Sequence, residues 1–275
     1  MKTGINPLYV VKTLVMAYLL ICVSACSLQR VFMYYPATGI QPPEAYGLSR
    51  FADVRLQDKD GTHVHAWYAQ AHPGYSTFLF FHGNGGNNAD RAEYFRALTD
   101  AGFGLLALDY RGYGASDGSP SEEGFYEDAR AAIEYATRTL HLPPNQIVLY
   151  GESIGTGVAV QMATEFPAAA IVLQSPYTSI EALGKERFSW LPVHSLIVDK
   201  FDSLSKIASV HAPLLLFHGE NDNIIPVEQG KILFAKANEP KEAVFFSLQG
   251  HNDLNVGERV KALLAFGHKY RLIKG

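Results

Sequence analysis

The chain has 275 residues, a length that fits one large domain or two small ones. Hydrophobic residues make up 48% of it, enough for a sizeable core, and the formal net charge is −4 without long runs of one sign. No basic stripe follows the chain, so composition and charge argue against a nucleic-acid partner.

The first 25 residues have the composition of a secretory signal peptide. Lys2 and Lys12 make the start positive, residues 14–23 are almost wholly apolar, and the small residues Ser24 and Ala25 follow. This order of basic, apolar and small residues is typical of a cleaved signal. The apolar run is shorter than the about 20 residues that a transmembrane helix needs. An uncleaved N-terminal anchor stays open as the alternative.

Cys26 ends this segment. Residues 23–26, Val-Ser-Ala-Cys, resemble the lipobox of bacterial lipoproteins, in which the cysteine receives a diacylglycerol and becomes the mature N-terminus. The resemblance implies a lipidated Cys26 and a protein anchored to a membrane of the bacterial cell envelope. Ser27 resembles the sorting pattern that directs such proteins to the outer membrane. The other cysteine, Cys22, would leave with the signal, so no disulfide is expected in the mature chain.

Residues 26–50, which contain three prolines, are predicted to form a tether. A strand pair is expected next, Phe51–Leu56 and His63–Tyr68, because a turn sequence joins two runs with strand character. The period of two places His63 and His65 on one face of the second strand. A metal site needs three or four convergent ligands, so we interpret the two histidines as ordinary strand residues.

Strands and helices then alternate to the C-terminus. The expected strands are 77–81, 104–108, 147–150, 168–173, 213–217 and 244–248, and the expected helices are 89–99, 122–139, 155–165, 227–237 and 257–270. Continuous apolar runs suit parallel strands that are covered on both faces. The alternation predicts a single doubly wound α/β domain over residues 51–275. Residues 176–211 lack a strand and are predicted to form a helical lid or substrate-binding insertion; a packing pair of helices stays open.

A candidate nucleophile stands where one strand ends, the edge at which open α/β sheets bind ligands. The strand 147–150 runs into Gly-Glu-Ser-Ile-Gly (151–155), a G-x-S-x-G nucleophile elbow. Its two glycines let the backbone turn tightly without clashing side chains. The helix that follows directs its free amides toward the same space. The pattern therefore predicts that Ser153 is the nucleophile.

A serine hydroxyl needs a base to react at neutral pH, and the base needs an acid to orient it. His251 follows the last strand, and its loop position favours it over the other candidate histidines, His82, His218 and His268. Asp222 follows the strand 213–217 and precedes His251 by 29 residues, room for one helix and one strand. Glu220 and Asp253 stay open as alternative acids.

Two backbone amides are expected to stabilise the oxyanion. Ile154 directly follows the nucleophile, and Asn84 lies in the run His-Gly-Asn-Gly-Gly (82–86) after the strand 77–81. Glycines 85 and 86 would let this loop pass close to a substrate. A phosphate cradle is the alternative, but the run lacks the lysine and Ser/Thr of a P-loop.

Five motifs together resemble the α/β-hydrolase superfamily, and its small α/β-hydrolase-domain branch in particular. They are HGNGGN (82–87), DYRGYGAS (109–116), GESIG (151–155), HGEND (218–222) and GHND (250–253). The resemblance covers about residues 50–270. It implies a mostly parallel eight-stranded sheet with helices on both faces, a short helical lid, and a triad in the chain order Ser153, Asp222, His251. It gives Asp109 a structural or site-lining role. Gly85 stands where relatives often have alanine.

The predicted function is that of a serine hydrolase. It would cleave carboxylic ester or thioester bonds of a small acyl ester or acylated substrate through an acyl-enzyme. No metal or organic cofactor is expected, and the membrane would be contacted through the N-terminal lipid. A serine peptidase with the same triad and a catalytically silent scaffold lipoprotein stay open as alternatives.

Overall fold

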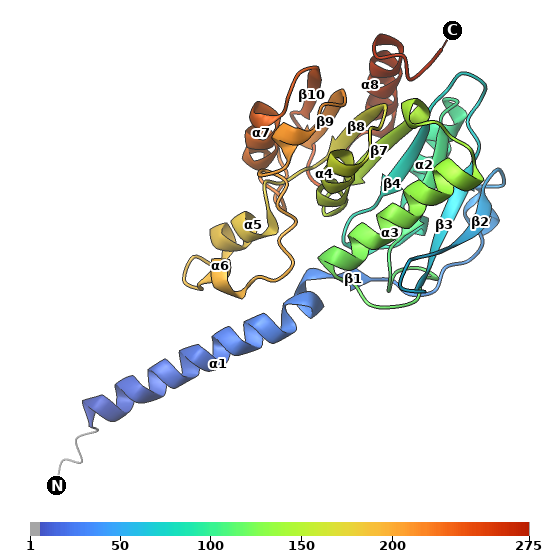
Figure 1. Cartoon of the computed structure of the whole chain (residues 1–275). Helices are drawn as coiled ribbons and strands as arrows, with labels where there is room; N and C mark the ends of the chain where they lie inside the picture. The colour runs from blue at the N-terminus through green and yellow to red at the C-terminus, as the bar shows by residue number, and fades with distance from the viewer. Residues whose placement is uncertain (1–5, 275) are drawn as a thin grey trace.

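The computed structural model describes residues 6–274. In this part of the chain an eight-stranded sheet has the order β10-β9-β8-β7-β4-β6-β3-β2 (Figure 1). Its strands are β2 (Ala52–Gln57), β3 (His63–Ala69), β4 (Thr77–Phe81), β6 (Gly104–Asp109), β7 (Ile147–Glu152), β8 (Ala170–Gln174), β9 (Leu214–Gly219) and β10 (Lys241–Phe246). The strands from β10 to β6 are parallel, whereas β3 and β2 run antiparallel to their neighbours. The predicted mostly parallel sheet is confirmed.

The middle of the sheet is buried on both faces. Every residue of β4, β6, β8 and β9 is buried. Successive side chains alternate between the faces, so Leu79 and Phe81 join one apolar cluster while Phe78 and Phe80 join the other. These two clusters form the core, and they explain why the strands have continuous apolar sequences.

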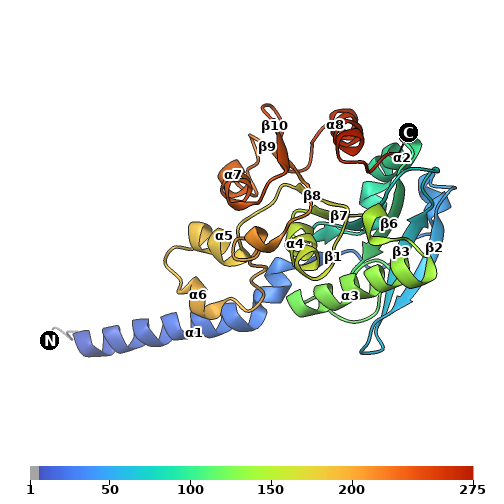
Figure 2. The ribbon, with the colours of Figure 1, turned by 45° about the horizontal axis from the view of Figure 1, so that its top comes forward.

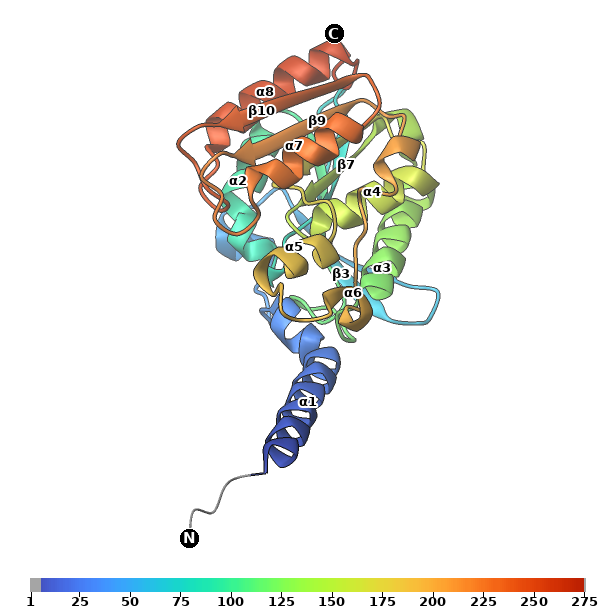
Figure 3. The ribbon, with the colours of Figure 1, turned by 90° about the vertical axis from the view of Figure 1, so that its left-hand side faces the viewer.

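Helices cover both faces of the sheet, as Figure 3 shows. One face is covered by α3 (Glu122–Glu134), α4 (Gly155–Glu165) and α7 (Val227–Lys236), and the other by α2 (Ala92–Asp100) and α8 (Val256–Lys269). A π-helical turn, Tyr135–Thr139, extends α3 to the expected end of that helix. The doubly wound arrangement predicted from the alternation of elements is therefore present.

The last strand differs from its prediction. It was expected at 244–248, but β10 spans Lys241–Phe246, with Lys241 paired to Leu214 of β9. As the edge strand it buries only Phe246 fully, so its apolar pattern determines the register weakly. The Lys241 ammonium also donates to the carbonyl oxygens of Phe234 and Ala237 at the end of α7, which holds the start of the strand in place.

Two short α-helices, α5 (Ile180–Arg187) and α6 (Val193–Leu196), and a 3-10 turn at Ile207–Ser209 lie in the connection between β8 and β9, where no strand was expected. Figure 2 shows α5 and α6 between α1 (Pro7–Met33) and the rest of the domain. Tyr18 of α1 donates to the carbonyl of Trp190, and Gln29 donates to that of Leu196. The insertion therefore contacts the N-terminal helix.

The N-terminal helix α1 projects from the domain (Figure 1). Cys26 lies exposed on it, and the helix continues beyond the expected signal to Met33. Among the described residues α1 is the helix long and apolar enough to cross a membrane, criteria that a signal sequence also meets.

Residues 34–50 pack against the domain instead of forming a free tether. The strand β1 (Tyr35–Pro36) pairs with β5 (Gly85–Gly86), and the Tyr34 side chain is buried. Leu48 is buried too, and the segment ends at the buried Phe51. These large apolar side chains explain the docking, because exposing them would forfeit their burial in the core.

Candidate active site

The turn after β7 has the geometry of a nucleophile elbow. Ser153 has a φ of +51°, the left-handed region that a non-glycine residue rarely adopts. Its amide donates to the carbonyl oxygen of Gln174 on the neighbouring strand at 2.9 Å, which holds this conformation. A side chain on Gly151 would clash with the carbonyl of Gly155, and one on Gly155 with the carbonyl of Phe81. Both glycines of the elbow are therefore required by the turn.

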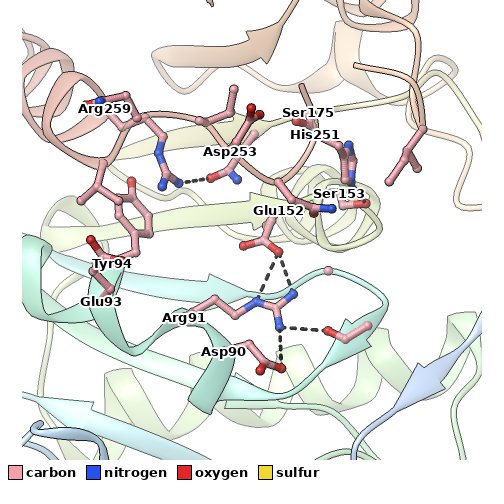
Figure 4. A pocket seen from close by; sticks show the side chains of 18 of the residues that line it. Asp90, Arg91, Glu93, Tyr94, Glu152, Ser153, Ser175, His251, Asp253 and Arg259 are labelled. Carbon is pink, nitrogen blue, oxygen red and sulfur yellow. Dashed lines mark hydrogen bonds and ion pairs between the residues drawn. The ribbon is translucent and has the colours of Figure 1, made fainter. Parts of the chain in front are cut away.

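His251 faces Ser153 from the loop between β10 and α8 (Figure 4). Its Nε2 atom lies 3.1 Å from the Ser153 hydroxyl, and its Nδ1 atom lies 2.7 Å from Oδ2 of Asp222. The imidazole thus joins a hydroxyl and a carboxylate that come from two other loops. This is the arrangement in which a neutral imidazole accepts the serine proton while the carboxylate orients the ring.

Asp222 is held rigidly behind the imidazole. Its Oδ1 atom accepts hydrogen bonds from the amides of Ile224 and Ile225, at 2.9 and 2.8 Å. Burial would raise the pKa of Asp222, but contacts from His218, His251 and the Ile225 amide hold that pKa well below the ordinary value of a carboxyl. The carboxylate is therefore ionised at neutral pH.

Neither alternative acid is hydrogen-bonded to the imidazole, whose nitrogens contact Asp222 and Ser153. Asp253 is exposed and accepts from the Gly250 amide, and Glu220 is exposed. Of the other histidines, His268 is exposed on α8. The buried His218 is bonded to the carbonyl of Ile225 and supports the Asp222 loop.

His82 shapes the loop that carries Asn84. It is fully buried, and its Nδ1 atom lies 2.6 Å from the carbonyl oxygen of Gly83. Burial and the Arg91 charge lower its pKa to about 4, so it is neutral at physiological pH. Asp109 is also buried and accepts from the amide of Asn88, which agrees with a structural role.

The two amides expected to hold an oxyanion flank the nucleophile. Ile154 caps the start of α4 directly after Ser153. On the other side, Gly83 packs so closely that a Cβ placed on it would lie 3.4 Å from the Ser153 Cβ, and Asn84 is the next residue. The Asn84 carbonyl accepts from the Tyr113 hydroxyl at 2.8 Å and from the Tyr35 amide at 3.0 Å. These bonds fix the orientation of the loop.

A polar cavity of about 880 Å³ opens beside Ser153 and contains residues that the sequence analysis missed (Figure 4). Arg91 forms an ion pair with Glu152 at 2.7 Å. Farther along the wall are Tyr94, Gln174 and Arg259. Glu152 was visible within the GESIG motif, but no local pattern marked the other four residues, because they come from four separate elements.

A second cleft, of about 810 Å³, lies between α1 and the insertion. Its wall is mostly apolar and includes Phe32, Ile180, Leu183, Phe188, Leu191, Leu196 and Ile197. Asn84 and Ile224 line both this cleft and the polar cavity. The two spaces therefore meet at the loops that surround Ser153.

One histidine of the β3 pair, His65, is bonded to two carboxylates. The Nδ1 atom of His65 lies 2.8 Å from the Asp109 carboxylate and its Nε2 atom lies 2.5 Å from that of Asp53, so both ring nitrogens are occupied. Between residues 6 and 274, no group of three or more His, Cys, Asp or Glu side chains is placed to hold a metal ion.

Comparison with known proteins identifies the family. Residues 76–191 match the model of the alpha/beta hydrolase fold. The chain is 41% identical over 229 residues to an uncharacterised protein of Mycobacterium tuberculosis, covering 82% of each chain. It is 31% identical to YfhR of Salmonella typhimurium, covering 80% of each, and 33% identical to the human alpha/beta hydrolase domain-containing protein 17B, covering 69% of this chain and 65% of that one.

Solved structures agree on the fold. An esterase of Pyrococcus furiosus superimposes with a TM-score of 0.68 at 20% identity, covering 87% of this chain and 98% of the other. An esterase domain from Rhodothermus marinus gives 0.62 at 23% identity, covering 82% and 100%. The sheet order, the elbow geometry and these matches lead to one conclusion: the chain belongs to the α/β-hydrolase family.

Proposed function

We propose that this protein is a serine hydrolase that cleaves carboxylic ester or thioester bonds. The supporting observation is the continuous set of contacts from Ser153 through His251 to Asp222, at 3.1 and 2.7 Å. These distances are within hydrogen-bond reach for a nucleophile, its base and the group that orients the base. The names of the solved esterases agree with this activity but belong to those proteins.

The reaction follows from the position of each group. Ser153 attacks the carbonyl carbon while its proton passes to Nε2 of His251. The ionised Asp222 accepts a hydrogen bond from Nδ1 and stabilises the imidazolium that forms. The imidazolium then protonates the leaving alcohol or thiol, and an acyl-enzyme on Ser153 remains. A water molecule, activated by the same imidazole, releases the carboxylic acid and restores the hydroxyl.

The tetrahedral oxyanion of each step would be held by the amides of Ile154 and Asn84. Preorganised donors of this kind stabilise a charge that exists only in the transition state. The amide of Ile154 also lies at the positive end of the helix dipole of α4, which begins at Gly155. That dipole favours a negative charge at the same place.

The apolar cleft suits the acyl part of the substrate. Its volume of about 810 Å³ lies within the range of small-molecule sites, and its wall reaches the oxyanion loop at Asn84. An acyl chain there would remove apolar surface from water while its carbonyl reaches Ser153. The lid α5–α6 would then serve as the wall of the acyl site.

The substrate test is a series of p-nitrophenyl esters of rising chain length. We expect wild-type protein to hydrolyse them and Ser153→Ala to lose activity to background. Ser209→Ala changes an exposed serine that lines neither cavity; it is the matched control and should retain activity. Activity that persists in Ser153→Ala at the wild-type level would reject the proposal.

We also propose that Cys26 is lipidated and anchors the protein as an outer-membrane lipoprotein of the bacterial envelope. The Arg30 guanidinium contacts Asp199 at 2.7 Å, and this contact lies beyond Cys26, so it remains after cleavage. Expression with an alkyne fatty acid should label wild type and Cys22→Ser but not Cys26→Ser. Membrane-bound, unlabelled wild-type protein would instead favour α1 as an uncleaved anchor.

A further inference from the structure

Arg259 is a buried cation in the wall of the polar cavity. It lies on α8 and is 6% exposed. Its Nη1 atom donates to Oε1 of Gln174 at 2.7 Å, while its buried Nε atom has no hydrogen-bond partner among the described residues. The Cζ atom lies 3.8 Å from the centre of the Tyr94 ring. Buried charges are normally paired, so an arginine held by an amide and a ring requires an explanation.

Among the described residues, no carboxylate forms an ion pair with Arg259, whose guanidinium donates to the Gln174 side chain instead. Glu152 already accepts two hydrogen bonds from Arg91, at 2.7 and 3.3 Å. Burial opposes the ionisation of Glu152, but the Arg91 guanidinium lowers its pKa, so this pair carries one negative and one positive charge. The remaining carboxylates of the cavity wall, Asp90, Glu93 and Asp253, are exposed to water. The buried part of the wall therefore has one positive charge in excess.

The position of Arg259 relative to the nucleophile is fixed by Gln174. The backbone carbonyl of Gln174 accepts from the amide of Ser153, and its side chain accepts from Arg259 and from the Tyr150 hydroxyl. Gln174 thus links the elbow directly to the guanidinium. Figure 4 shows Arg259 and Ser153 on the same cavity, with Glu152 between Ser153 and Arg91.

The start of α8 lines the same cavity as the guanidinium. Asn255, Val256 and Gly257, the cap and first residues of the helix, line the same cavity. The first amides of a helix lack intrahelical partners and lie at the positive end of its dipole. A buried arginine next to a helix N-terminus offers an anion both direct hydrogen bonds and a favourable field.

We propose that Arg259 and the first turn of α8 form a subsite for an anionic group, a carboxylate or a phosphate, on the leaving-group side of the scissile ester. The inference rests on the proposed hydrolase activity and narrows its substrate class. The apolar cleft takes the acyl chain on one side of Ser153, and the polar cavity takes the charged alcohol or thiol part on the other. The substrate is thus an acyl ester or thioester whose leaving group carries a negative charge.

The test compares an anionic ester with its neutral counterpart. 4-Acetoxybenzoate and its methyl ester differ by the charge on the leaving group, and 4-acetoxyphenyl phosphate provides the phosphate form. In wild type, Arg259→Gln, Arg259→Lys and Lys261→Gln, the ratio of kcat/KM for anionic to neutral ester is measured. Intrinsic reactivity cancels when this ratio is compared between proteins.

We expect the ratio to fall about tenfold or more in Arg259→Gln, the loss typical of a hydrogen bond to a charged group. Arg259→Lys retains the charge and should give an intermediate ratio. Lys261→Gln removes an exposed charge from the same helix and should match wild type. A larger effect on the carboxylate or on the phosphate ester identifies which anion is preferred. Equal ratios in wild type and Arg259→Gln overturn the subsite and leave the hydrolase intact.

A binding measurement separates the two proposals. If wild type hydrolyses neither these esters nor the p-nitrophenyl series, the hydrolase proposal fails, and inorganic phosphate then tests the subsite alone. At constant ionic strength, phosphate should raise the Tm of wild type but not that of Arg259→Gln. The same shift in both proteins, or no shift in wild type, overturns the anion subsite.

Discussion

The side-chain amide of Asn84 donates to the backbone carbonyl of Met33, the last residue of α1, at 2.8 Å. The loop proposed to hold the oxyanion is thereby bonded to the segment that leads from the N-terminal helix. Tyr35, two residues farther on, donates its amide to the Asn84 carbonyl. The N-terminal segment therefore supports the active site directly.

This relationship predicts the effect of Asn84→Ala. The backbone amide of residue 84 remains, but the loop that orients it loses the side-chain hydrogen bond to Met33, worth about 1 kcal/mol. We expect kcat on p-nitrophenyl esters to fall about fivefold with little change in KM, because the contact acts on the oxyanion. Asn238→Ala removes a comparable side-chain amide, bonded to the carbonyls of Ala208 and Val210. That control should lose stability but retain kcat; an equal kcat loss in both variants would contradict the account.

Asp222→Asn should have a much larger effect. The amide retains the shape of the side chain but stabilises the wrong tautomer of His251 and offers no charge to the imidazolium. We expect kcat to fall by about a thousandfold or more. Steady-state kinetics with a neutral ester measures this loss. Glu220→Gln changes an exposed carboxylate of the same loop and should stay within about twofold of wild type. If Glu220→Gln lowered kcat more than Asp222→Asn, Glu220 would be the residue that orients His251.

Gly155→Ala tests the elbow. The added methyl group would meet the carbonyl oxygens of Phe81 and His82, which are backbone atoms of the central sheet. We expect the free energy of unfolding to fall by about 2 kcal/mol or more. At Gly85 the same substitution meets nothing within 4 Å, so Gly85→Ala should be nearly neutral. Denaturant melts of the two variants give the comparison, and equal destabilisation would show that the elbow tolerates a side chain.

The lowered pKa of His82 predicts that the free energy of unfolding depends on pH. Its pKa is lowered from 6.5 to about 4 in the folded protein. The unfolded chain therefore takes up a proton near pH 6.5 while the folded chain does not, so stability is complete above pH 6.5 and falls toward pH 4. The loss amounts to about 3 kcal/mol across that window.

Denaturant unfolding between pH 4 and 7 checks this window. His82→Gln should flatten the slope, whereas His268→Gln, an exposed histidine of α8, should leave it unchanged. Identical slopes in all three proteins would show that other groups cause the acid sensitivity.

Much of the fold was predictable because its strands are buried on both faces. Continuous apolar runs located β4, β6, β7 and β9 within about two residues. The exposed edge strand β10 was misplaced, because an edge position leaves the apolar pattern incomplete. The docking of residues 34–50 was also missed. Prolines suggested a tether, but Tyr34 and Leu48 find partners in the core that only the assembled domain provides.

The residues of the candidate site also fall into a group that the sequence predicted and a group that it did not. Ser153 could be placed from sequence because the elbow requires glycines at fixed spacing, and Asp222 and His251 follow strands whose ends meet at one edge. Arg259 could not be recognised, since nothing near it in sequence distinguishes it from a surface arginine on an amphipathic helix. Its burial depends on Tyr94 and Gln174, which come from α2 and β8.

The most direct test of the hydrolase account is covalent labelling with a fluorophosphonate. The probe reacts with a serine hydroxyl only when a neighbouring base activates it. The account predicts stoichiometric labelling of the folded wild-type protein on the peptide that contains Ser153, no labelling of Ser153→Ala, and strongly slowed labelling of His251→Ala. Labelling of a different serine, or none in folded wild-type protein, would contradict an activated nucleophile at Ser153.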